Sequence, residues 1–153
     1  MNFNDLKQQL SEVPADKIVF VGLGNWMRCD DAAGLVLTEQ IENSGAFYNS
    51  HFIKADTTPE NCLARILQHD PQLIIMIDSA DWGGSPGDIT WISNEKIDNA
   101  NISTHSYSIS LIEKYLKANG PSEVKYLVIQ PYKMDFGFAL SEQVEKKLSQ
   151  FFN

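Results

Sequence analysis

The residues best suited to chemistry share one position in the sequence: each comes at or just beyond the end of a short apolar run. They are Asp30, Asp31, Asp56, Asp78 and Gln130. If those runs are parallel strands, their carboxyl ends meet along one edge of a sheet, where α/β proteins bind ligands. The sequence therefore predicts that these side chains gather on one rim of the fold.

His105 could add a nitrogen ligand to this rim. It begins a predicted helix and follows Ser103 and Thr104, whose hydroxyls are suited to capping that helix. Two carboxylates, from Asp31 and Asp78, and one imidazole suit a borderline divalent ion such as nickel, zinc, iron or manganese. The sequence has no short-range ligand pair of the HExxH kind, so the residues alone leave a metal site as one hypothesis among several.

A dinucleotide site is the first alternative, because Gly22 and Gly24 follow an apolar run. The third glycine of that fingerprint would stand at position 27, which is Met27, and a side chain there would crowd the pyrophosphate. The helix that follows also begins too late. Both features disfavour this interpretation.

A receiver-like phosphoacceptor signalling domain, with Asp78 as the modified residue, is a second alternative. That fold would also need a lysine just past its last strand to neutralise the phosphoryl group, whereas Gln130 and Pro131 stand here. A non-catalytic metal-sensing domain on the same fold is a third alternative, because a fold does not by itself determine function.

Some of these residues also have purely structural interpretations. Asp30 is expected to cap the helix that follows it, and Gln130 could bond a neighbouring loop. His51 and His69 are expected at the surface. The sequence contains no convincing nucleophile, because the acids beside Cys29 would suppress its thiolate.

Alternating helices and strands must position the rim. Short apolar runs predict five strands, over residues 17–23, 46–53, 72–77, 88–92 and 124–129. Helical spacing of apolar residues predicts five helices, over residues 3–12, 32–43, 57–67, 104–120 and 140–152. This order predicts an α/β single-domain three-layer sandwich: a mostly parallel twisted sheet of about five strands, with helices on both faces, as in phosphorylase- and hydrolase-like folds.

Composition limits the classes of function. The 153 residues suit one domain, and the formal charge of −8 disfavours a nucleic-acid partner. No apolar run approaches the roughly 20 residues that cross a bilayer, and the polar first residues do not resemble a signal peptide. We therefore expect a cytoplasmic protein without membrane insertion, in which Cys29 and Cys62 are free thiols.

Six motifs, taken in order, are similar to those of the hydrogenase maturation endopeptidases. They are Gly22-Leu23-Gly24-Asn25 with Asp30-Asp31, then Asp56-Thr57-Thr58-Pro59-Glu60-Asn61, Ile77-Asp78-Ser79-Ala80-Asp81, Pro86-Gly87, Thr104-His105 and Ile129-Gln130-Pro131. The resemblance covers residues 17–150 as the protease-like core and leaves residues 1–16 as an additional N-terminal helix. Trp26, Cys29 and Ala32 depart from the family's pattern, which could alter the path of the first loop and the fit of the substrate.

The resemblance implies a particular activity. Members of the family remove a C-terminal extension from the NiFe hydrogenase large-subunit precursor after nickel has been inserted. The family's nickel-recognition residues carry over to Asp31, Asp78 and His105, which would be both the metal-contacting and the catalytic residues. The nickel would belong to the substrate. Bond cleavage could use the metal to polarise the carbonyl or activate water, or use Asp31 as a base.

Overall fold

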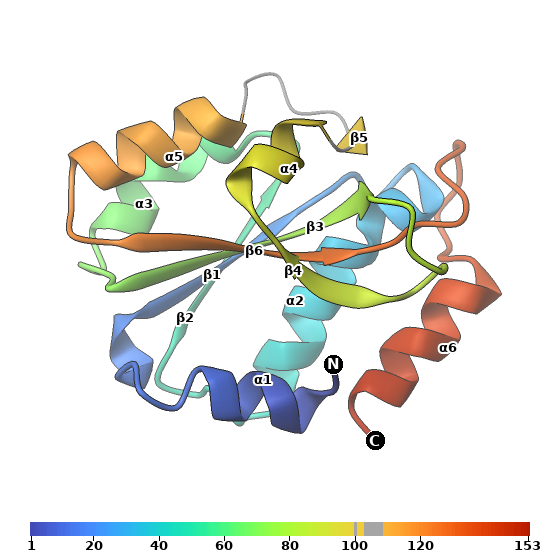
Figure 1. Ribbon diagram of the computed structural model, residues 1–153, viewed down its shortest axis with the longest axis horizontal. Helices are drawn as coiled ribbons and strands as arrows, with labels where there is room; N and C mark the ends of the chain where they lie inside the picture. The colour runs from blue at the N-terminus through green and yellow to red at the C-terminus, as the bar shows by residue number, and fades with distance from the viewer. Residues whose placement is uncertain (100, 103–108) are drawn as a thin grey trace.

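The computed structural model describes residues 1–99, 101–102 and 109–153. Its centre is a twisted sheet with strand order β2-β1-β3-β6-β4 (Figure 1). Four strands run parallel: β1 (Ile18–Leu23), β2 (His51–Asp56), β3 (Leu73–Asp81) and β6 (Glu123–Ile129). Two pair antiparallel: β4 (Ile89–Ile92) with β6, and the short β5 (Asn101–Ile102) with the end of β3. The predicted class is confirmed.

Helices cover both faces of this sheet (Figure 1). One face carries α1 (Phe3–Gln9), α2 (Ala33–Asn43) and α6 (Glu142–Phe151). The other carries α3 (Leu63–Leu67), α4 (Asn94–Asn99) and α5 (Ile109–Ala118). Three short 3-10 turns complete the described elements: η1 (Ala15–Lys17), η2 (Cys29–Ala32) and η3 (Pro59–Cys62). None of the described helices is both long and apolar enough to cross a membrane.

The central strands are buried on both faces, as their continuous apolar sequences predict. Alternate side chains of β3 enter different cores. Leu73, Ile75 and Ile77 pack with α1, α2 and α6, whereas Ile74 and Met76 pack with the helices of the other face. This alternation fixes which face each later residue of β3 points toward.

Several predicted boundaries are wrong. Residues 46–50 form turns, so the second strand begins at His51. The third strand extends to Asp81, so Asp78 lies inside it. The sequence analysis also missed α4 and β5, because neither has an apolar run long enough to reveal it. Of the helix predicted over residues 104–120, α5 is seen from Ile109, and residues 103–108 lie outside the described part of the chain.

The N-terminal helix contributes to the main core. Asn2 and Asp5 form a capping box at its start, and Phe3 and Leu6 are buried. The Phe3 ring lies 4.8 Å from that of Phe152, measured between centroids. The helix therefore packs on the sheet face beside α6, where its burial stabilises the fold.

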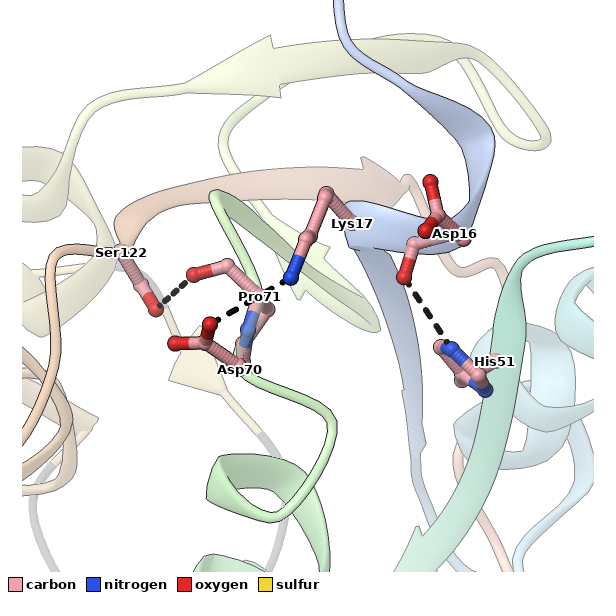
Figure 2. Close-up of polar contacts among 6 residues, drawn as sticks. All are labelled: Asp16, Lys17, His51, Asp70, Pro71 and Ser122. Atoms are coloured by element: carbon pink, nitrogen blue, oxygen red, sulfur yellow. Dashed lines mark hydrogen bonds and ion pairs between the residues drawn. The ribbon is translucent and has the colours of Figure 1, made fainter.

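The amino edge of the sheet is closed by an exposed ion pair and by side-chain hydrogen bonds to backbone carbonyls, drawn in Figure 2. Lys17 Nζ lies 3.3 Å from a carboxylate oxygen of Asp70, and the Ser122 hydroxyl donates to the Pro71 carbonyl over 2.7 Å. His51 Nε2 lies 3.2 Å from the Asp16 carbonyl. These contacts join the ends of the strands without burying a carboxylate.

Candidate active site

At the carboxyl edge of the sheet, the connections of two neighbouring strands diverge. Strands β1 and β3 are neighbours, but β1 leads through α2 to β2 on one side, and β3 leads to β4 and β6 on the other. Open α/β sheets bind ligands at such switch points. Asp31 lies in η2, which follows β1, and Asp78 lies in β3. The two predicted acids therefore stand on either side of this point.

Gly34 brings these two segments into contact. A Cβ atom at position 34 would lie 2.5 Å from the Ile77 carbonyl oxygen, 2.6 Å from that of Leu23 and 2.7 Å from the Asp78 Cα. The missing side chain lets the first turn of α2 rest directly on the ends of β1 and β3. Helix α2 is entered through η2, so this close approach also holds Asp31 near the end of β3.

The two acids are almost completely buried. Asp31 is 0% exposed and Asp78 is 3% exposed. The alternation of β3 directs Asp78 toward the face covered by α3, α4 and α5, because Ile74, Met76 and Ala80 pack there. One Asp78 oxygen accepts a hydrogen bond of 2.8 Å from the Ser79 N–H. Buried ionisable groups in a crevice are candidates for function, since desolvating a charge is costly.

The loop that carries Asp31 folds back on itself. Gly24 has a φ of +147°, and a Cβ atom there would lie only 2.1 Å from the Asp31 carbonyl oxygen. The Asn25 N–H donates to that same carbonyl over 3.3 Å, and the Asn25 side chain accepts from the Met27 N–H over 2.9 Å. The glycine and asparagine of the first motif therefore shape the turn that presents Asp31.

Asp30 has a structural role that differs from the predicted one. Its carboxylate does not cap η2 or α2. It accepts backbone N–H bonds from Tyr132, Lys133 and Ser141, and the Ser141 hydroxyl also donates to it over 2.8 Å. Asp30 thus ties the loop after β6, and the start of α6, to the loop after β1. Sequence reasoning missed these partners because they lie more than a hundred residues away.

Gln130 orders the loop that follows β3, in agreement with its predicted bond to a neighbouring loop. Its side-chain oxygen accepts from the Trp82 and Gly84 N–H groups, and its amide nitrogen donates to Asp81. These bonds from Gln130, together with the Gly83 N–H, lower the pKa of the exposed Asp81 carboxyl below its usual value. Gln130 and Asp81 therefore stabilise the rim by ordering the loop just beyond Asp78.

The third predicted residue, His105, lies outside the described part of the chain. Among the residues that the structure describes, no group of three histidine, cysteine, aspartate or glutamate side chains could hold a metal ion. Asp56, also predicted on the rim, ends β2 with a φ of +54° and is exposed. Of the three residues predicted to contact a metal, the described part of the chain contains Asp31 and Asp78, whose segments meet at Gly34.

The two thiols are free, as predicted, and both are buried. Burial raises the pKa of the Cys62 thiol, so this cysteine is protonated at neutral pH. Cys29 has a φ of +47° and lies under Gly137. Both side chains are buried, so neither is presented to solvent as a nucleophile.

Comparison with known proteins decides the family. A family model for hydrogenase maturation proteases matches residues 35–153. A putative hydrogenase maturation protease from Methanocaldococcus jannaschii is 31% identical over 136 residues, covering 84% of this chain and 80% of that protein. The chain belongs to the hydrogenase maturation protease family. The family predicted from the six motifs is therefore confirmed.

Other members of the family agree with this assignment. The hydrogenase 3 maturation protease of Escherichia coli K12 is 28% identical over 128 residues, covering 83% of this chain and 81% of that protein. The crystal structure of a NiFe hydrogenase maturation protease from Thermococcus kodakarensis KOD1 superposes with a TM-score of 0.81 at 23% identity, covering 95% of this chain and 92% of that chain. The latter likeness supports the fold.

Proposed function

We propose that this maturation protease removes the C-terminal extension of a NiFe hydrogenase large-subunit precursor after contacting the nickel already inserted into that precursor. Asp31, Asp78 and His105 would make that contact. The observation that carries the proposal is the pair of buried carboxylates held on either side of the switch point. Family membership supports proteolysis, and the nickel step rests on the chemistry of these residues.

The donor types suit the proposed substrate. Carboxylate oxygens and a neutral imidazole can add ligands to a nickel centre that cysteines of the precursor already hold. Binding would then distinguish a loaded precursor from an empty one.

The elements on either side of residue 105 support its place in the proposal. Ile102 of β5 pairs with Ala80, two residues beyond Asp78 in β3. Ile109, the first residue of α5, is buried in the core of the face toward which Asp78 points. Residue 105 is three positions after Ile102, and three residues of extended chain span about 11 Å at most. The connection is therefore short enough for an imidazole to reach Asp78.

The chain's own residues would position the scissile bond and handle protons. Nickel contact by Asp31 and Asp78 would fix the precursor's tail against the crevice, and such positioning lowers the barrier to reaction. An ionised Asp31 could accept a proton from the attacking water, or the substrate's metal could polarise the carbonyl. A pH profile of cleavage by the Asp31→Asn variant would distinguish these routes.

The proposal is tested with two forms of a large-subunit precursor, one nickel-loaded and one nickel-free. We expect only the loaded form to be shortened. Asp31→Asn, Asp78→Asn and His105→Ala should each reduce the cleavage rate by about 100-fold or more, as removal of a central catalytic group does. Mass spectrometry of the products measures both effects.

Two matched variants control this experiment. Asp70→Asn and His69→Gln change an acid and a histidine at the opposite edge of the sheet, and should leave the rate unchanged. Equal cleavage of both precursor forms would refute nickel recognition. Full activity of the three site variants would refute the site assignment.

A further inference from the structure

Large apolar side chains gather on the two loops beside the candidate site. The loop after β1 exposes two of them and the loop after β6 exposes three. They are Trp26, Met27, Tyr132, Phe136 and Phe138, here called the aromatic surface. Phe136 and Phe138 are 73% and 75% exposed. Side chains of this size are usually buried, so their joint exposure points to a covering partner.

Backbone hydrogen bonds fasten the two loops into one unit. The Gly137 N–H donates to the Met27 carbonyl over 2.8 Å, and the Cys29 N–H donates to the Gly137 carbonyl over 2.9 Å. The Asp30 N–H donates to the Lys133 carbonyl over 2.8 Å. A Cβ atom at position 137 would lie 2.7 Å from the Cys29 sulfur, so a side chain there would displace this cysteine. Met27 is consequently held beside Gly137, and Gly137 is the residue that separates Phe136 from Phe138 in the chain.

The same bonds connect the aromatic surface to the site. Asp30, whose carboxylate anchors the loop after β6, is the neighbour of Asp31. Met27 and Asp31 also belong to one tight loop, because Asn25 bonds to both. The exposed rings therefore have a fixed position relative to the buried acid.

The chemistry of the surface suits a folded protein. Tryptophan, tyrosine, phenylalanine and methionine are the residues enriched at the centres of protein interfaces. The rings of Phe136 and Phe138 pack edge to face, with centroids 5.4 Å apart, which limits the side-chain freedom that binding would remove. Lys133 and Asp135 cancel in charge, in a chain whose net charge is −8. Apolar contact is thus the main attraction that this surface offers.

We infer that the aromatic surface docks the folded body of the large-subunit precursor while its C-terminal tail enters the crevice. The inference rests on the proposed function. Its basis is continuity: a precursor whose tail reaches Asp31 must lay adjoining surface over the loops that hold Asp31. Such docking would select a folded precursor, because a free tail could enter the crevice without covering these rings.

The test measures binding separately from cleavage. The probe is a nickel-free large-subunit precursor that retains its C-terminal extension, titrated against the full-length protease. We expect the double variant Phe136→Ser with Phe138→Ser to raise Kd by about tenfold or more, since truncating an aromatic residue at the centre of an interface commonly weakens binding by that factor. Met27→Glu tests the other loop and should act in the same direction. Because these side chains are exposed, the variants should keep the wild-type melting temperature.

Tyr48→Ser is the matched control, since Tyr48 is 81% exposed and precedes β2 at the amino edge. It should leave Kd at the wild-type value. Unchanged binding in both the double variant and Met27→Glu would overturn the inference. The inference would also be overturned if sedimentation showed a wild-type dimer that the double variant no longer forms, while precursor binding stayed unchanged. Should the proposed nickel step fail instead, the nickel-free precursor would be cut, and the same docking effect would be measured as a rise in KM.

Discussion

The two edges of the sheet handle polar groups in opposite ways. At the amino edge, Lys17 and Asp70 form an ion pair whose members keep 33% and 74% of their side-chain surface exposed (Figure 2). At the carboxyl edge, Asp30, Asp31 and Asp78 are all buried. An exposed pair contributes at most about 1 kcal/mol, whereas a buried carboxylate costs several kcal/mol unless it is compensated. The carboxyl edge therefore buries its acids, whereas the ion pair at the amino edge stays largely exposed.

The buried acids of the carboxyl edge also differ from one another. Asp30 is compensated within the chain by four hydrogen bonds, and its function is to join two loops. Asp31 and Asp78 are buried on either side of the switch point. Asp30 therefore has a structural role, whereas Asp31 and Asp78 are the two buried acids for which we propose a chemical role.

Helix α2 runs between the two edges and has a glycine near each end. Substituting these two glycines should give the largest difference in the free energy of unfolding. Gly34→Ala would place a methyl group 2.5 Å from the Ile77 carbonyl oxygen and push α2 off the strands. We expect the free energy of unfolding to fall by about 2–4 kcal/mol, the range for a forced backbone shift. Urea denaturation followed by circular dichroism measures this change.

Gly45→Ala is the control at the other end of the helix. Gly45 has a φ of +74°, but no atom lies within 4 Å of the position that the alanine methyl group would take, so only backbone strain is added. The expected loss is about 1 kcal/mol. Equal losses at the two positions would show that close packing at the carboxyl edge is not what constrains Gly34.

Asp30→Asn should have the next largest effect on the free energy of unfolding. The amide would keep one acceptor oxygen but would turn its own N–H groups toward the backbone donors of Tyr132, Lys133 and Ser141. We expect a loss of about 2 kcal/mol, because charge-assisted bonds are removed and buried donors are left unsatisfied. If the substitution increases the rate of hydrogen exchange more in residues 132–141 than in β6, the loss of stability lies in this loop. A uniform increase in exchange would contradict the assigned role.

Most of the fold could be predicted from apolar periodicity, because the central strands and amphipathic helices have strong local signals. Asp31 and Asp78 could be placed on one rim because parallel strands end together. The partners of Asp30 and Gln130 could not be predicted, since they depend on contacts between loops far apart in the sequence. The extension of β3 past Asp78 was missed because a polar residue usually ends an apolar run, whereas pairing with β6 and β5 continues it here.

Asp70→Asn tests the amino edge. Removing one charge from the exposed pair with Lys17 should change the free energy of unfolding by less than about 1 kcal/mol. The effect should shrink further in high salt, which screens exposed charges. A loss as large as that of Asp30→Asn would remove the distinction between the two edges.

The smallest effect concerns two histidines at the amino edge, which lie at the surface as predicted and are partly buried. The rings of His51 and His69 stack with centroids 3.8 Å apart, near Glu42 and the Asp16 carbonyl. Burial, and to a lesser extent the charge of His51, lowers the pKa of His69 below its usual 6.5.

As pH falls below 6.5, the unfolded chain therefore binds a proton at this position before the folded chain does, and stability is lost until the folded pKa is passed. His69→Gln should flatten the decline in melting temperature between pH 7 and pH 5 slightly, because a glutamine does not titrate. An unchanged slope would mean that the stacked pair does not contribute to acid sensitivity, and that the pH dependence comes from carboxylates alone.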